Sequence, residues 1–178
     1  MTNERLKELF SAKRISGYAS EAEHRDNFLL MQRIAPKIGI LEIITRNKVA
    51  EILDITDDDF ISKQSLGYWV KAMDEARIHN KIIDLSKIDF RRYSGFNINT
   101  KLRNYQKASV AYILLRLIRN RAFHFENLYK LNESGTPRVS ACKDFGKTRV
   151  IIGISPNMIE AFIDDLLTCF GDDVGEYL

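Results

Sequence analysis

The chain has 178 residues, of which 45% are hydrophobic and 10% aromatic, so it is long enough for one domain with a real core and too apolar to be disordered. Its 27 basic and 24 acidic residues give a net charge of +3, which is compatible with a nucleic-acid partner but does not by itself predict one. The few Pro (three) and Gly (nine) residues favour a compact, mainly helical protein over an all-β one.

Cysteine usage and hydropathy bear on location. Cys142 and Cys169 are isolated and lack C-x-x-C spacing, which favours free thiols in a reducing compartment and argues against a structural metal site. The N-terminus is charged, and no apolar run approaches the roughly 18 residues that a membrane span needs. We therefore expect a cytoplasmic protein without a signal peptide, a membrane span, a metal or a cofactor.

Helical periodicity dominates the first third of the chain. Residues 2–11 have the pattern of a short amphipathic helix, and Ser20 with Glu23 has the spacing of a capping box, which predicts the start of a long helical tract. Pro36 either kinks that tract or begins a new helix there. Apolar residues then keep helical spacing over residues 37–53.

The middle of the chain alternates between helix and loop signals. Residues 54–59 form an acidic connector, and acidic residues suit the first turn of a following helix. Residues 65–78 predict that helix, and residues 82–90 a shorter one. Residues 91–100 contain Gly95 and several small polar residues that favour turns, which indicates a loop.

The C-terminal region begins with a break at residues 132–137. The segments 138–142 and 148–154 predict two short strands around a turn that contains Gly146, because the second is short and rich in β-branched residues. Ser155 and Pro156 then suit the start of a last helix, which ends near residue 170. The sequence thus predicts a single domain over residues 1–178, mainly α, a helical bundle with a short β-hairpin near residues 138–154.

The most hydrophobic helical segment lies inside a predicted helix over residues 101–131. Residues 108–118 hold only Ser109 and Arg116 as clearly polar positions, and a helix that is apolar on nearly every side belongs inside a bundle. This buried segment leads directly into Arg119-Asn120-Arg121, and His124 follows. Burial of the helix could therefore fix the orientation of these polar groups.

The residues Arg119, Asn120 and His124 remain as candidates after the common catalytic motifs are found to be absent. A histidine suits proton transfer near neutral pH, and an arginine fork suits phosphate oxygens. Asn120 and His124 are one helical turn apart, whereas Arg119 lies about 140° around a regular helix from His124. Arg119 and His124 can meet one phosphate only if the helix starts or bends here, or if a second subunit completes the site.

The segment RNRAFHFENLY, residues 119–129, resembles the R-[NHD]-x-x-x-H signature of the HEPN superfamily of all-helical, RNA-associated domains. Residues 27–53 and 65–73 are similar to its Abi-like branch, which is linked to abortive phage infection. The resemblance implies a metal-independent ribonuclease of phage-defence or toxin type. Arg119 would bind the scissile phosphate, His124 would be the acid/base and Asn120 would orient one of them. The RNA 2′-hydroxyl would be the nucleophile, leaving a 2′,3′-cyclic phosphate, and a homodimer would form a composite site.

Three further residues are candidate RNA or phosphate ligands. Arg121 extends the basic end of the helix, and Arg46-Asn47 repeats the Arg-Asn pair upstream. Arg46 and Asn47 could equally be structural, hydrogen-bonded to the central helix. Some toxin members of the superfamily carry a Tyr two residues after the His, where this chain has Glu126, so the modification of that Tyr is not expected here.

Other interpretations of the same residues stay open. Arg119 and Arg121 could be solvated charges, and His124 a packed core histidine. The aromatic residues Tyr68, Trp69, Phe123 and Phe125 could stack on bases, although core packing is the commoner use of aromatics at helical spacing. In place of a nuclease, the chain could be a non-catalytic module that binds RNA, a nucleotide or a protein. An antitoxin is a possible partner of either.

Overall fold

The computed structural model describes residues 2–177. Over that part of the chain the elements follow in the order α1 (Asn3–Phe10), α2 (Ala12–Ile15), α3 (Glu21–Ile52), α4 (Asp58–Lys63), α5 (Leu66–Ala76), α6 (His79–Ile82), η1 (Phe90–Tyr93), α7 (Asn104–Phe123), β1 (Val139–Phe145), β2 (Thr148–Ile154), η2 (Pro156–Met158), α8 (Ile159–Thr168) and α9 (Asp172–Gly175). The prediction of a mainly α fold with a short β-hairpin is confirmed.

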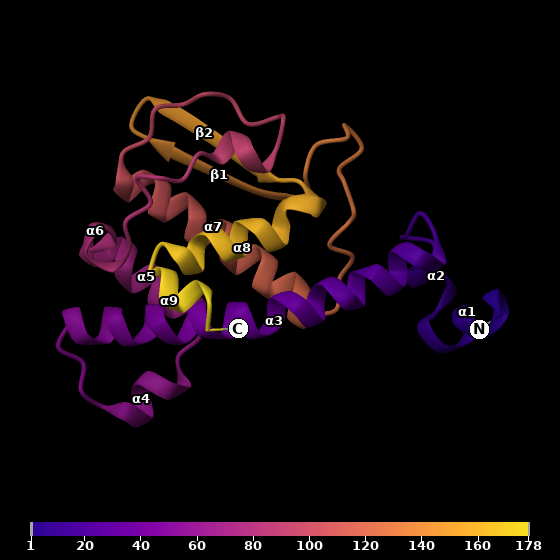
Figure 1. Ribbon diagram of the computed structural model, residues 1–178, viewed down its shortest axis with the longest axis horizontal. Helices are drawn as coiled ribbons and strands as arrows, with labels where there is room; N and C mark the ends of the chain where they lie inside the picture. Colours follow the sequence, from indigo (N-terminus) through magenta and orange to yellow (C-terminus); the bar gives the residue numbers. More distant parts are fainter. Residues whose placement is uncertain (1, 178) are drawn as a thin grey trace.

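The long helix α3 is the base on which the other elements are arranged (Figure 1). Helices α5, α7 and α8 all pack against it, and the hairpin covers α7. Figure 1 shows α1 and α2 beside the first turns of α3, away from the hairpin. None of the helices in residues 2–177 is both long and apolar enough to cross a membrane.

Helix α3 runs through Pro36 without ending, so the alternative of a new helix at that residue is wrong. Proline removes one hydrogen bond from a helix and its ring crowds the preceding turn. Here Pro36 lies on the exposed side, while Ile34 and Ile38 on either side of it are fully buried. Packing on both flanks holds the helix together across the proline. The helix begins as predicted, since Ser20 Oγ accepts a hydrogen bond from the Glu23 amide.

Helix α7 forms the centre of the core, as its composition predicts. Its buried positions include Leu114, Leu115 and Ile118, while Arg116 faces solvent. A hydrogen bond of 2.8 Å joins the buried hydroxyls of Tyr112 on α7 and Thr45 on α3. The two helices run in opposite directions, because Glu42, which precedes Thr45 on α3, contacts Arg119, which follows Tyr112 on α7.

The hairpin pairs β1 with β2 in antiparallel register, from Val139 opposite Ile154 to Phe145 opposite Thr148. Side chains alternate between the two faces of a strand, so Lys143 lies on the same face as the buried Val139 and Ala141. This face packs on α7. A lysine is therefore carried toward the helical core.

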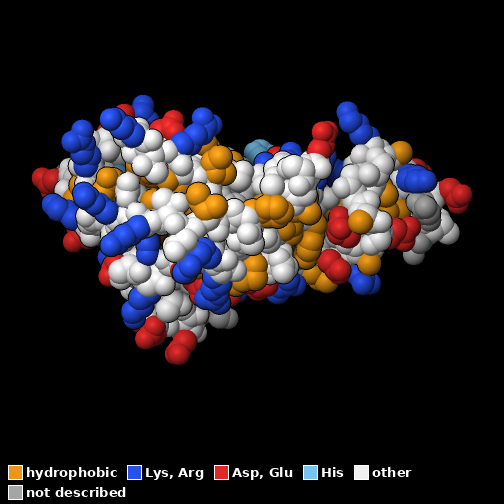
Figure 2. Space-filling view, turned by 90° about the horizontal axis from the view of Figure 1, so that it is seen from above, with side chains coloured by type: hydrophobic (Ala, Val, Ile, Leu, Met, Phe, Trp, Pro, Cys, Tyr) orange, Lys and Arg blue, Asp and Glu red, His pale blue; other side chains and the backbone are white. Residues whose placement is uncertain are grey.

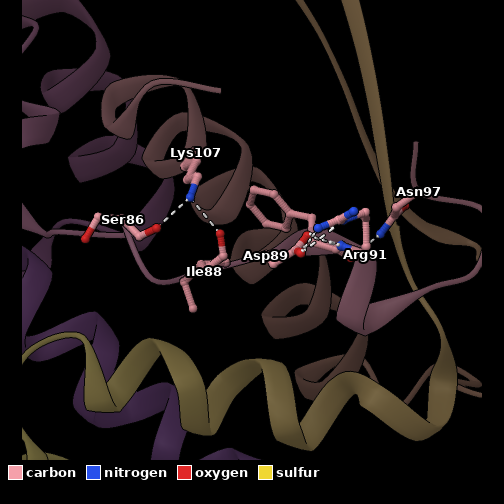
Figure 3. A network of polar contacts seen from close by, with 7 residues as sticks. Ser86, Ile88, Asp89, Arg91, Asn97 and Lys107 are labelled. Carbon is pink, nitrogen blue, oxygen red and sulfur yellow. Dashed lines mark hydrogen bonds and ion pairs between the residues drawn. The ribbon is translucent and has the colours of Figure 1, made fainter. Parts of the chain in front are cut away.

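The segment between α6 and α7 is irregular, and the prediction of a helix over residues 82–90 is wrong. Three of its backbone carbonyls accept hydrogen bonds from the ammonium of Lys107 on α7. Figure 3 shows those of Ser86 and Ile88, at 2.9 and 2.7 Å, and the third is that of Leu85, at 3.1 Å. Asn97 in the same segment donates to the Gly153 carbonyl and accepts from the Gly153 amide, both at 2.8 Å. These tertiary hydrogen bonds replace the bonds that a helix would have made.

Candidate functional site

The end of α7 lies earlier than the sequence suggests. The prediction of helix to residue 131 is wrong, because α7 ends at Phe123 and His124 is its C-cap. The Phe125 amide donates to the Ala122 carbonyl and the Glu126 amide to the Arg121 carbonyl, which is a Schellman motif. Phe125 adopts the left-handed conformation that this motif requires, with φ of 53°.

The segment after α7 is held by Asn27 of α3. The Asn27 amide group donates to the Glu126 carbonyl at 3.1 Å, and its oxygen accepts from the Leu128 amide at 2.9 Å. Asn27 is almost fully buried, and the Tyr18 hydroxyl is another of its partners. Both peptide contacts would be lost if the helix continued, so Asn27 fixes where His124 stands.

Arg119 is positioned by a carboxylate from α3. Its Nε donates to Glu42 Oε2 at 3.3 Å, and Glu42 Oε1 accepts from the Leu66 amide at the start of α5 at 3.1 Å. Arg119 Nη1 makes a long hydrogen bond of 3.5 Å to Asn120 Oδ1, and the guanidinium lies 5.2 Å from the Phe123 ring centroid. Glu42 thus joins three helices and holds the guanidinium by one edge, leaving other donors for a ligand.

His124 is exposed to solvent, and among residues 2–177 no hydrogen bond to its imidazole is present. A packed core histidine is therefore not what the structure shows. Asn120 hydrogen-bonds Arg119 rather than His124. Because α7 is regular through residue 123, the helix neither starts nor bends between Arg119 and His124, and one chain leaves them on different sides of the helix end.

The other predicted phosphate ligands have different surroundings. Arg121 is largely buried and donates to Glu126 at 2.9 Å, and burial lowers the pKa of its guanidinium. Arg46 stands one turn beyond Glu42 on α3 and is half-buried, and its Nε has no hydrogen-bond partner in the part of the chain that the structure describes. Asn47 is exposed. The antiparallel packing of α3 and α7 places Arg46 on the side of Glu42 away from His124.

A second polar cluster, not predicted from the sequence, lies between the hairpin and the helices. Asp74 accepts hydrogen bonds from His79 at 2.7 Å, from Ser109 at 3.2 Å and from Lys143 at 3.2 Å, and Lys143 also contacts Ser109. The cluster lines a cavity of about 720 Å³. Burial raises the pKa of the Asp74 carboxyl, but the hydrogen bonds from His79 and Lys143 outweigh it and the net pKa is lowered.

The polar side chains of this cluster hydrogen-bond one another. One feature of the sequence could have indicated the cluster. Strand alternation places Lys143 on the inward face of β1, where a charged residue needs a partner. We interpret the cluster as a structural tie between β1, α5 and α7. Among residues 2–177, no three His, Cys, Asp or Glu side chains gather as a metal site would require.

Comparisons with known proteins give no further guide to this site. No protein-family model matches the chain, and it has no significant match among the curated proteins or among the solved structures.

Proposed function

We propose that this chain is a HEPN-like, metal-independent RNA endonuclease of the cytoplasm, acting in phage defence or as a toxin. The observation that carries the proposal is that one end of a buried helix holds both an exposed imidazole, at His124, and a positioned guanidinium five residues earlier, at Arg119. Groups that are fixed by the fold yet open to solvent are suited to bind and act on a ligand.

The chemistry assigned to each group follows from its type. Neutral His124 would take the proton of the RNA 2′-hydroxyl, whose oxygen then attacks the adjacent phosphorus. Arg119 would bind the nonbridging oxygens, where charge builds up as the new bond forms. Loss of the 5′-oxygen would leave a 2′,3′-cyclic phosphate, and Asn120 would orient Arg119. Arg121, Arg46 and Asn47 are proposed as additional RNA contacts.

A homodimer would bring the two groups to one phosphate. Within one chain Arg119 and His124 lie on different sides of the end of α7, so His124 of one copy would act with Arg119 of the other. The second His124 would return a proton to the leaving oxygen. RNA flanking the cut could extend over the basic surface: Figure 2 shows Lys and Arg side chains crowded on the half of one face opposite the N-terminal helices.

A non-catalytic module is the second candidate, and the same exposed end supports it. Such a module would hold RNA, a nucleotide or a partner protein without cutting, within an abortive-infection or toxin–antitoxin system. An antitoxin could cover the end of α7 in either case.

The test is cleavage of a mixed RNA pool, with EDTA present, by the wild type and by His124→Ala. We expect wild-type products that end in 2′,3′-cyclic phosphate, and about a hundredfold or greater loss of rate in the variant. Because the His124 imidazole makes no hydrogen bond within residues 2–177, and the backbone bond of its amide to the Asn120 carbonyl is kept in the variant, the variant should keep the melting temperature of the wild type. Absence of cleavage by either protein at high concentration, together with RNA binding by both, would favour the non-catalytic module.

A further inference from the structure

Core packing is the commoner expectation, and base stacking the alternative, for the aromatic residues singled out in the sequence, and the structure shows that these residues differ in burial. Trp69 is fully buried, as expected. Phe123 and Phe125 are 49% and 52% exposed, and they stand on either side of His124. Half-exposed phenylalanines are ordinary one at a time, but two that flank a candidate catalytic group call for a physical reason.

Phe125 is an unfavourable choice for its own backbone. The residue after a helix C-cap in a Schellman motif adopts positive φ, which glycine or asparagine accepts readily and a bulky side chain does not. The φ of 53° therefore strains the backbone of Phe125, whereas a glycine or asparagine at this position would end the helix without that strain. Burial offers only partial compensation, since one side of the ring lies 6.1 Å from Phe28, centroid to centroid, and half of the residue stays exposed.

Each exposed ring is accompanied by an arginine. The Arg119 guanidinium lies 5.2 Å from the Phe123 centroid, and Arg14 of α2 donates to the Phe125 carbonyl at 3.5 Å. Arg14 forms no ion pair within residues 2–177. The nearby carboxylates Glu42 and Glu126 are already paired, with Arg119 and Arg121. Along the chain, a phenylalanine thus precedes and another follows His124, the first with Arg119 over its ring and the second with Arg14 at its carbonyl.

We infer that Phe123 and Phe125, the residues immediately before and after His124, are stacking platforms for two unpaired bases of single-stranded RNA. This inference rests on the proposed function, because it takes RNA as the ligand. Single-strand sites combine aromatic faces for bases with cations for the backbone, and stacking accepts any base. An interface with a protein would favour a more continuous apolar surface with its charges at the rim.

The consequence is a preference for unpaired RNA without strict sequence choice. A base in a duplex has both faces covered by its neighbours, so it cannot lie on either ring. The two platforms would hold the nucleotides that flank the scissile phosphate, and the arginines would hold the phosphates. Phe123 and Phe125 would then act in binding and alignment, and His124 in proton transfer.

Binding to two short oligonucleotides of equal length separates stacking from charge. One is mixed-sequence single-stranded RNA with methylated 2′-oxygens, so that it cannot be cut, and the other has the same backbone without bases. We expect Phe123→Ala and Phe125→Ala each to weaken binding of the base-bearing strand by about tenfold. Binding of the abasic strand should not change, and Phe123→Trp should keep wild-type affinity for both.

Two controls guard against trivial effects. Phe96→Ala removes a ring that is 60% exposed, from the loop beside the hairpin, and should leave both affinities unchanged. Phe125→Asn suits the positive φ, so it should fold at least as well as the wild type yet bind the base-bearing strand as weakly as Phe125→Ala.

Several results would overturn the inference. Equal losses on both strands would mean that the rings act only through the shape of the site, and no loss would mean that bases do not touch them. Loss of a homodimer with unchanged RNA affinity would assign the rings to contact between copies. If the wild type binds neither strand, RNA as ligand and the proposed function fail together. If it binds and cleaves RNA while the Phe variants match it, only the platforms fail.

Discussion

The two ends of α7 carry similar kinds of residue and use them in opposite ways. At the N-terminal end, Asn104 accepts from the Leu85 amide at 2.7 Å and donates to the Ile83 carbonyl at 2.9 Å. Lys107 donates to three carbonyls, and Ser109 belongs to the Asp74 cluster. At this end, cationic and amide side chains hydrogen-bond the backbone of an irregular segment, and they therefore stabilise the fold.

At the C-terminal end the corresponding groups are left open. Arg119 has one carboxylate partner at 3.3 Å and a long contact to Asn120, and His124 faces solvent between two exposed rings. A side chain whose hydrogen-bonding groups are all used within the fold cannot also bind a ligand, whereas a side chain with unused donors can. We therefore expect substitutions at the N-terminal end of α7 to change mainly stability, and substitutions at its C-terminal end to change mainly the binding of a ligand.

The largest expected effect is on activity, at the open end. Arg119→Lys keeps the charge but removes the planar fork, and should lower the rate of RNA cleavage by about a hundredfold or more, with little change in melting temperature. Arg116→Ala, an exposed arginine one turn earlier on α7, is the matched control and should retain most of the activity. Equal losses in the two variants would mean that the guanidinium of Arg119 has no special role compared with another arginine of α7.

The sequence predicts the buried segment of α7 better than it predicts where the helix ends, for a physical reason. The buried segment of α7 follows from its apolar residues, and the hairpin follows from β-branched residues around a glycine turn. The end of the helix could not be predicted locally. The residues after Phe123 suit a helix, and it is Asn27, about a hundred positions away, that hydrogen-bonds the backbone of Glu126 and Leu128 in a non-helical conformation.

The candidate site shows the same limit. Arg119, Asn120 and His124 stand out in the sequence as a spaced motif, and the structure places them on one helix end. In the sequence, Glu42 is one polar residue within a helix of apolar spacing, and nothing in that spacing indicates a partner on α7. The exposure of Phe123 and Phe125 depends on where the helix ends, so the sequence does not predict that exposure either.

A smaller effect, on stability, is expected at the satisfied end. Lys107→Met keeps most of the side-chain volume but leaves three carbonyls without their donor, which should cost about 2–3 kcal/mol and lower the melting temperature by roughly 5–10 °C. At a temperature where the variant is folded, RNA cleavage should match the wild type. The exposed Lys101→Met is the control. A variant with normal stability and impaired cleavage would reverse the roles assigned to the two ends.

The smallest effect concerns pH and the Asp74 cluster beside the satisfied end. Its carboxyl has a lowered pKa in the fold because hydrogen bonds from His79 and Lys143 outweigh burial. A lowered folded pKa gives stability that is present above the unfolded value, about 3.9, and is lost as the pH falls through the folded value.

Asp74→Asn should therefore be less stable than the wild type at pH 7 in urea unfolding, by on the order of 1 kcal/mol, since the site is partly solvent-screened. The difference should shrink as the pH falls from about 3.9 through the lower pKa of the folded carboxyl, where the wild-type group takes up its proton and resembles the amide. Cleavage at pH 7 should survive the substitution. A stability difference that stays constant down to low pH would mean that Asp74 acts through packing, and that the ionic contacts of Lys143 and His79 contribute nothing to the tie.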